Sequence, residues 1–201
     1  MIKVKLKVLI MSLALHSCSG FDYFQAAPLI KNSLIGFKDI QISKDYIDQQ
    51  QYSFVKIKIG RSSPVILSLA FINDGIFEWV SADGERIYTL NGRIIRTDGL
   101  VHNFNLLTEK TLPEKDSLPA MQSRLIELTS PDATTMQTSR IEIEREDRSI
   151  ISINEKVETS SFNWNYINTY IVDKDLELVT HSVQHIHPKL SEFKIQFFYK
   201  F

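Results

Sequence analysis

From residue 52 onward, apolar and polar residues alternate along the chain in short runs, a pattern typical of half-buried β-strands. Tyr52 to Gly60 alternates cleanly, with valine and isoleucine on one face and lysines on the other. Val65 to Phe71 is instead a continuous apolar run, which predicts a strand buried on both faces. The other predicted strands cover residues 77–80, 86–90, 93–97, 100–107, 123–129, 140–146, 149–159, 162–172, 176–186 and 193–201.

Turn residues separate these runs and predict how the strands connect. Turn signals fall about every eight to ten residues in the first half, which indicates an antiparallel meander. Asn91-Gly92 is the strongest of them, because a type I′ hairpin turn needs two residues with positive φ. The strands of the second half are longer than usual and must therefore twist and bend. We expect an all-β, mainly antiparallel fold, a curved open sandwich or half-barrel.

Little of the chain predicts helix. Ser43 is a good N-cap for one or two helical turns, so we expect one or two short N-terminal helices before the first strand. Residues 109–119 contain two prolines and mixed charges, and we expect them to form the longest loop. The chain has neither an alternation of strands and helices nor an internal repeat.

The N-terminus has the features of an export signal. An apolar stretch of about eight residues, 8–15, follows three lysines, and it is too short to span a bilayer. It leads into Leu15-His16-Ser17-Cys18, which resembles the processing site of bacterial lipoproteins and contains the only cysteine of the chain. We therefore predict that residues 1–17 are a signal peptide and that Cys18 is acylated.

This interpretation sets the predicted domain organisation and location. Residues 18–42 would be the lipidated N-terminus and tether, and residues 43–201 a single β-rich domain. Two or three acyl chains anchor a protein stably to a membrane. Ser19 follows the cysteine where an aspartate would favour the inner membrane, so we expect an outer-membrane lipoprotein that faces the periplasm.

Composition excludes several classes of function. The formal net charge is −1, with 23 basic and 24 acidic residues interspersed, so no basic patch indicates a nucleic-acid partner. A single cysteine forms no internal disulfide. Beyond the signal, no long apolar run predicts a transmembrane helix.

Few residues suggest catalysis or metal binding. His181, His185 and His187 would share one face of a continuous strand, where they could bind zinc, but a polar strand face explains them equally well. Glycoside hydrolysis needs two carboxylates. Of the nearest acids, Asp74 and Asp83 occupy turn sequences, and Glu78 lies between them. The serine-nucleophile and phosphate-loop motifs are missing. We expect neither an enzyme nor a cofactor or metal.

Three residues remain as candidate contacts for a glycan or a protein partner. Trp79 and Trp164 could stack on sugar rings, although both lie in alternating strand patterns where packing in the core is the alternative. Arg93, just after the Asn91-Gly92 turn, could contact a glycan or partner.

Several segments together resemble the YjbF/GfcB family of lipoproteins from exopolysaccharide and group 4 capsule operons. The resemblance covers roughly residues 43–200, behind the cysteine, and departs at Ile171, where the family pattern has tryptophan. It implies an outer-membrane lipoprotein with a curved all-β fold and a role in making or exporting extracellular polysaccharide. The segments that carry it are Tyr52 to Gly60, Trp79 to Gly84, Leu90 to Arg93, Thr97 to Leu100, Asn168 to Asp173 and Ser182 to Pro188.

These observations lead to two hypotheses about function. The first is a non-enzymatic accessory factor in exopolysaccharide or capsule production and export, which binds polysaccharide or another protein of that machinery. The alternative is a periplasmic carrier or chaperone for a hydrophobic, lipid-like ligand, because a curved sheet with an apolar concave face can hold acyl chains.

Overall fold

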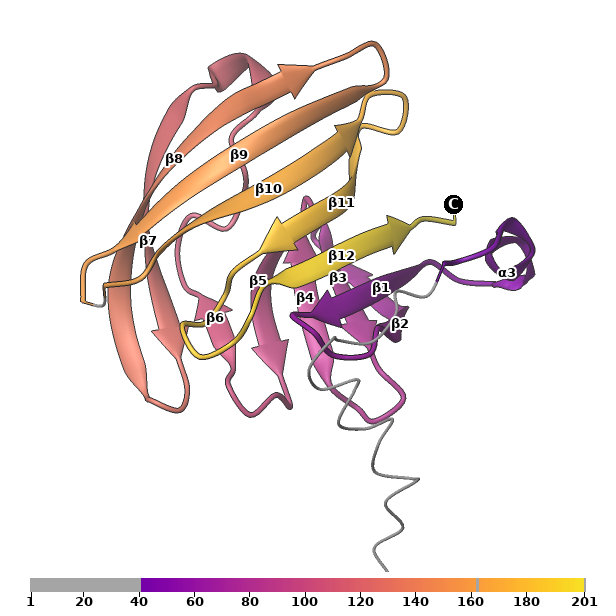
Figure 1. Cartoon of the computed structure of the whole chain (residues 1–201), viewed down its shortest axis with the longest axis horizontal. Coiled ribbons are helices and arrows are strands. Elements are labelled where there is room, and N and C mark those ends of the chain that lie inside the picture. The colour runs from indigo at the N-terminus through magenta and orange to yellow at the C-terminus, as the bar shows by residue number, and fades with distance from the viewer. Residues whose placement is uncertain (1–40, 162, 201) are drawn as a thin grey trace, which may run out of the picture. The chain divides into compact units, whose positions relative to one another are not determined.

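The alternation of apolar and polar residues becomes an alternation of inward and outward side chains around a closed barrel (Figure 1). The computed structural model describes residues 41–161 and 163–200. The barrel belongs to the unit Lys38–Phe201. The predicted signal peptide, Cys18 and most of the predicted tether lie outside the described residues.

Twelve antiparallel strands follow one another around the barrel, so the prediction of an all-β, antiparallel fold is confirmed. Each strand pairs with its neighbours in sequence. The strands are β1 (Phe54–Ile59), β2 (Val65–Asn73), β3 (Ile76–Val80), β4 (Arg86–Leu90), β5 (Arg93–Asp98), β6 (Phe104–Leu106), β7 (Ala120–Leu128), β8 (Ala133–Glu146), β9 (Ile150–Thr159), β10 (Asn165–Asp173), β11 (Leu178–Gln184) and β12 (Phe193–Phe198).

The expectation of an open sandwich or half-barrel was wrong, because the first and last strands pair with each other. The β1–β12 register runs from Phe54 opposite Phe198 to Ile59 opposite Phe193. On its other side, β1 pairs with β2. Closure satisfies the backbone groups that two open sheet edges would expose.

Helical structure is confined to two short segments of the described residues. The α-helix α3 (Lys44–Gln49) begins where the sequence predicts, with the Tyr46 N–H donating to Ser43 Oγ at 3.1 Å. The 3-10 turn η1 (Lys115–Ser117) interrupts the predicted long loop between β6 and β7. Within residues 41–161 and 163–200, no helix has the length and apolar character needed to cross a bilayer.

Strand β2 corrects a second expectation. Its continuous apolar run predicts burial on both faces, yet Phe71 is 68% and Ile72 52% exposed, and Leu67 is its one buried residue. A register shift between Leu69 and Phe71 interrupts the inward and outward alternation. The continuous apolar run therefore predicts the strand at this place correctly, but it does not predict that the side chains of the strand are buried.

The apolar core fills the inside of the barrel around Trp79, which is 0% exposed. Its indole N–H donates to Thr89 Oγ1 at 2.8 Å, so the one polar atom of the ring is satisfied. Phe77 stacks on the indole and Phe197 meets it at 62°. The proposed glycan contact at Trp79 is therefore corrected: the ring is a core residue.

The Asn91-Gly92 turn has the predicted backbone, with φ of +50° and +75°. A Cβ at Gly92 would overlap Val179 Cβ and both its methyl groups, so glycine is needed for space as well as for conformation. Gly84 also has positive φ, at +91°, but a Cβ there would have nothing within 4 Å.

Substitutions at these two glycines distinguish the cost of positive φ from the cost of steric overlap. We expect Gly84→Ala to lower the free energy of unfolding by about 1 kcal/mol, through positive φ alone. Gly92→Ala should cost roughly 2–4 kcal/mol, because overpacking adds to that strain. Urea denaturation of the full-length protein in detergent measures both, and equal losses would contradict the overlap.

Candidate functional site

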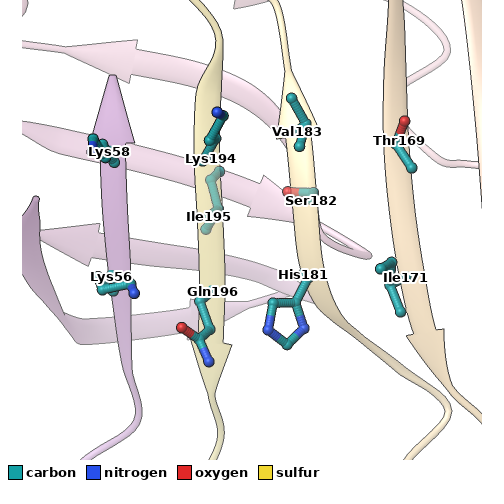
Figure 2. Close-up of a pocket in the computed structure, with 10 residues that line it drawn as sticks. All are labelled: Lys56, Lys58, Thr169, Ile171, His181, Ser182, Val183, Lys194, Ile195 and Gln196. Carbon is teal, nitrogen blue, oxygen red and sulfur yellow. The ribbon is translucent and has the colours of Figure 1, made fainter. Parts of the chain in front are cut away.

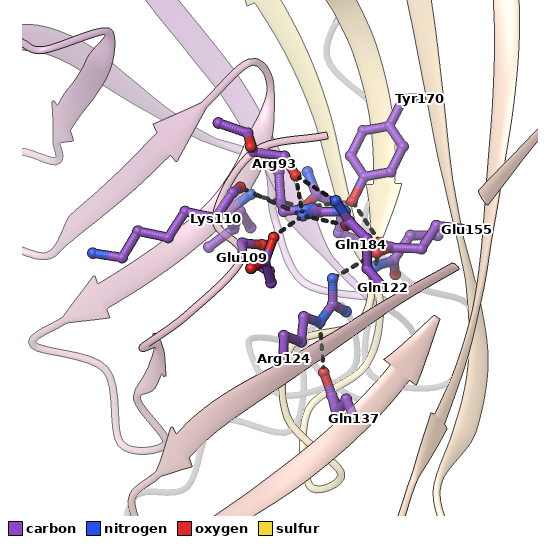
Figure 3. Close-up of polar contacts among 12 residues, drawn as sticks. Arg93, Glu109, Lys110, Gln122, Arg124, Gln137, Glu155, Tyr170 and Gln184 are labelled. Atoms are coloured by element: carbon purple, nitrogen blue, oxygen red, sulfur yellow. Dashed lines mark hydrogen bonds and ion pairs between the residues drawn. The ribbon is translucent and has the colours of Figure 1, made fainter. Parts of the chain in front are cut away.

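Three charged side chains meet inside the barrel and form the interior ion cluster: Arg93 of β5, Arg124 of β7 and Glu155 of β9 (Figure 3). Glu155 Oε1 accepts from Arg93 Nη2 at 2.7 Å and from Arg124 Nη1 at 2.5 Å. All three side chains are at most 3% exposed. Charge-assisted hydrogen bonds of this kind are the strong ones.

The second carboxylate oxygen of Glu155 is also satisfied. Oε2 accepts from Asn168 Nδ2 at 2.9 Å and from the Tyr170 hydroxyl at 3.0 Å, both on β10. Burial by itself would raise the pKa of Glu155, but Arg93 and Arg124 outweigh burial and lower the pKa to about 2. Because the folded pKa is depressed, this stabilisation is present above the ordinary glutamate pKa and is lost as pH falls toward about 2.

The cluster contains two cations and one anion. Uncharged acceptors take other donors of the two guanidinium groups, while the buried Arg93 Nε has no hydrogen-bond partner among the described residues. Arg93 Nη1 donates to the backbone carbonyls of Glu109 and Thr111, at 3.1 and 2.9 Å, which ties the loop before β7 to the interior. Arg124 Nε donates to Gln137 Oε1 at 3.0 Å. The role of Arg93 as a glycan or partner contact is therefore corrected, since its guanidinium is buried inside the barrel, where both terminal nitrogens donate hydrogen bonds.

The cluster is sealed from substrates. The cavity beside it, between Arg93, Arg124, Tyr166 and His185, has a volume of about 10 Å³, which is room for roughly one water molecule. A reactant cannot reach the Glu155 carboxylate in this arrangement. The cluster therefore organises the barrel interior.

The ion cluster predicts that removing the charge of the Glu155 carboxylate strongly destabilises the folded protein. Glu155→Gln should lower the free energy of unfolding by about 3–5 kcal/mol, because two buried guanidinium groups would lose their counter-charge. Glu158→Gln, on the exposed face of the same strand, is the matched control and should change it by at most about 0.5 kcal/mol. Urea denaturation of both full-length variants tests this, and similar losses would rule out the cluster as the cause.

The three histidines do not form the single face that their spacing predicts. Strand β11 ends at Gln184, so His185 and His187 leave the strand alternation. His181 points outward, His185 lies 5.5 Å from the Tyr166 ring, and His187 is 0% exposed. Among residues 41–161 and 163–200, no three His, Cys, Asp or Glu side chains gather as a metal site.

His187 instead stacks on His102, with ring centroids 4.8 Å apart and planes at 16°. Its Nδ1 accepts from the Lys189 N–H at 3.1 Å, which leaves the ring proton on Nε2 to donate to the Thr129 carbonyl at 3.1 Å. Burial lowers the pKa of His187, and nearby His102 lowers it further. The folded state therefore favours the neutral imidazole of His187.

A pH dependence follows from this pair. A histidine with a lowered folded pKa is protonated first in the unfolded chain, so stability is lost as pH falls below the ordinary value of about 6.5. We expect the Tm of the full-length protein to fall between pH 7.5 and 5.5, and less steeply in His187→Gln. Thermal unfolding followed by circular dichroism measures this, and parallel pH profiles would contradict it.

The candidate carboxylates lie too far apart in the fold to act together. Asp74 and Asp83 occupy the turns at opposite ends of β3, and Glu78 pairs with Arg86 at 3.4 Å on the outer surface. Trp164, the remaining candidate contact, is half-buried and packs against Tyr166 with ring centroids 4.4 Å apart.

A groove of about 210 Å³ crosses the outer face of β1, β12, β11 and β10 (Figure 2). We call it the outer groove. Side chains of alternate residues line it, while Ile195 and Ser182, between them, are buried. In one row across the four strands, Lys56, Gln196, His181 and Ile171 lie opposite one another, and in the next row Lys58, Lys194, Val183 and Thr169 do so.

Positive charge predominates in the outer groove. Its lining holds three lysines and one histidine and no carboxylate. Lys194 Nζ lies 3.5 Å from Glu192, outside the lining. Partial burial and nearby Lys56 lower the pKa of His181, so the imidazole is a neutral hydrogen-bonding group near neutral pH. Sequence reasoning found His181 and missed the rest, because the rows form only when β1 meets β12.

A second cavity, of about 150 Å³, opens at one end of the barrel and is mainly apolar. We call it the mouth cavity. Asp83 and Glu85 supply its carboxylates, and a hydrogen bond from Ser81 lowers the pKa of Glu85. The apolar lining residues are Ile57, Ile59, Val65, Leu67, Ile87 and Leu100.

Comparison with known proteins agrees with the resemblance drawn from the sequence segments. The model of the family described as group 4 capsule polysaccharide lipoprotein GfcB, YjbF matches residues 29–198. The uncharacterized lipoprotein YjbF of Escherichia coli (strain K12) is 22% identical over 183 residues, 84% of this chain and 85% of that protein. The crystal structure of the hypothetical lipoprotein YmcC from Escherichia coli (K12) has the same fold. Its TM-score is 0.66 at 17% identity, over 85% of this chain and 95% of that one.

Proposed function

Because this chain belongs to the family of group 4 capsule polysaccharide lipoproteins, we propose that it is a lipid-anchored accessory protein that acts by binding and not by catalysis. The pathway is capsule or exopolysaccharide production and export. The anchor is the predicted acylated Cys18, and the location is the periplasmic face of the outer membrane. The ligand is a glycan or another envelope component of the same machinery.

The outer groove is the observation that carries this proposal. It offers cationic and hydrogen-bonding side chains at the surface, whereas the charges of the interior ion cluster satisfy one another in a sealed space. The candidate carboxylates stand apart and lack the paired arrangement of a glycosidase. A binding surface without catalytic groups suits an accessory factor.

A carrier for a hydrophobic ligand is the second candidate, and the mouth cavity favours it. Its lining is apolar, but about 150 Å³ is well below the roughly 300–1,000 Å³ of ordinary ligand pockets. Such a cavity could take only part of an acyl chain. Native mass spectrometry of the full-length protein, extracted from membranes, decides the matter: a co-purifying lipid that Leu67→Gln removes would favour the carrier.

The anchor has its own test. Cys18→Ala should abolish incorporation of labelled palmitate and move the protein out of the membrane fraction, because Cys18 is the only cysteine available for acylation. Ser19→Ala changes the neighbouring residue and leaves the cysteine in place, so it is the matched control. Unchanged palmitate uptake by Cys18→Ala would overturn the anchor.

The function is tested by complementation. A strain that lacks the gene should secrete less exopolysaccharide, and the wild-type gene should restore secretion. Lys58→Gln/Lys194→Gln, which removes two charges from the outer groove, should fail to restore it, whereas Lys156→Gln on the outer face of β9 should succeed. Normal exopolysaccharide in the deletion strain would overturn the proposed function.

A further inference from the structure

We infer that the interior of the barrel binds one small monovalent anion, such as chloride, in the cavity of about 10 Å³ beside the interior ion cluster. We call this cavity, which Arg93, Arg124, Tyr166 and His185 help to line, the interior cavity. It is separate from the outer groove, so the inference goes beyond the proposed function and does not depend on it. The inference follows from the charge of the cluster, from the donors and acceptors in the cavity wall and from the size of the cavity.

The interior ion cluster carries one more positive charge than negative charge. Arg93 and Arg124 share the single carboxylate of Glu155 (Figure 3), and all three side chains are at most 3% exposed. Among the described residues, no other aspartate or glutamate is buried. The backbone carbonyls that accept from Arg93 Nη1 offset part of the cost of burying this charge, but a carbonyl carries no net charge. One monovalent anion would bring the charge of the cluster to zero.

Donors without an acceptor belong to the side chains that line the cavity. Arg93 Nε is buried and has no partner among the described residues, and a guanidinium nitrogen only donates. His185 Nδ1 is likewise buried and unpartnered within this part of the chain, and it donates when it carries the ring proton. The Tyr166 hydroxyl accepts from Gln137 Nε2 at 2.9 Å, which leaves its own O–H as a further donor. Burial raises the pKa of Tyr166 to about 12, so the hydroxyl keeps this proton.

The side-chain acceptors of the same wall are already in use. Asn168 Oδ1 accepts from the His185 N–H at 2.8 Å, and Gln184 Oε1 accepts from the Ile94 N–H at 2.8 Å. Both oxygens of Glu155 are held by the hydrogen bonds of the cluster. A water molecule needs acceptors for its two protons as well as donors, whereas an anion only accepts. The wall therefore suits an anion better than it suits water.

The dimensions of the interior cavity also select the ion. A volume of about 10 Å³ takes one occupant of roughly the size of a water molecule, and chloride is only slightly larger. Phosphate, acetate and the acidic groups of a sugar are larger, so the cavity excludes them. The rest of the wall is apolar, which strengthens the attraction between an anion and the guanidinium groups because the local dielectric constant is low. Its apolar residues are Ile94, Phe104, Leu106 and Ile186.

Thermal unfolding of the full-length lipoprotein in detergent tests the inference. One sample is purified throughout in about 0.2 M sodium chloride and the other in sodium gluconate of equal ionic strength, so that surface charges are screened equally. The gluconate anion is too large for the cavity. The Tm, measured by circular dichroism, should be about 3 °C or more higher in chloride, because an ion that binds only the folded state stabilises it.

General salt effects act in the other direction, because strongly hydrated anions such as gluconate are excluded from protein surfaces and stabilise folded states. A higher Tm in chloride therefore indicates a site. An equal Tm in the two salts, or a higher Tm in gluconate, would overturn the inference.

Two tyrosine variants assign the effect to the interior cavity. Tyr166→Phe removes one donor from its wall and should reduce the chloride-dependent rise in Tm to half or less. Tyr199→Phe is the matched control, since the Tyr199 hydroxyl donates to the Val179 carbonyl at 2.9 Å and is not part of that wall. The control should lower the Tm in both salts and keep the full difference between them. Equal chloride effects in the two variants would contradict the assigned position.

Crystals of the wild-type protein decide the matter even if Tyr166→Phe does not fold. At a long X-ray wavelength, chlorine gives an anomalous signal and a water oxygen gives almost none. We expect an anomalous peak within hydrogen-bond distance of Arg93 Nε in crystals grown from protein purified in chloride. A water molecule at that place, or chloride at surface positions as an adventitious ion only, would overturn the inference. Neither result changes the outcome of complementation, so the proposed function is judged separately.

Discussion

The Glu155 carboxylate, shared by two arginines, is the interaction on which the barrel interior depends. Its four hydrogen bonds come from Arg93, Arg124, Asn168 and Tyr170, so one side chain joins β5, β7, β9 and β10. Eight strands already enclose enough room for their own side chains, and twelve enclose more. Arginine, tyrosine and glutamine reach across that extra width, and apolar residues fill the remainder.

Because the interior is filled, the side chains that stabilise the barrel and the side chains that a ligand could reach lie in different places. Ions that would suggest chemistry in an open cleft are here bound to one another and to a loop that folds inward at Thr111. The accessible groups of the outer groove lie on the outer face of β1, β12, β11 and β10. The residues between the groove positions face the core, so a single alternation along β11 and β12 serves both packing and surface recognition.

The strands could be predicted from the sequence, whereas the contacts between side chains of distant strands could not. Alternation and the Asn91-Gly92 turn predicted nearly every strand, because both signals are local. Glu155 could have been noticed, since it shares the inward face of its strand with Ile153 and Val157. Its partners could not, because Arg93 is 62 and Arg124 is 31 residues away. The alternation likewise did not indicate that β11 ends at Gln184. Because the strand ends there, His187 leaves the strand and stacks on His102 in a buried position.

The pairing of β1 with β12 also constrains how the chain reaches its folded state. The strand that begins at Phe54 has its partner at Phe198, so this contact joins residues from the two ends of the barrel sequence. Until residue 198 is free, both strands present unpaired edges that can capture another chain. Closure of the barrel therefore depends on a contact of large sequence separation, and until it forms these edges need protection that the finished barrel no longer requires.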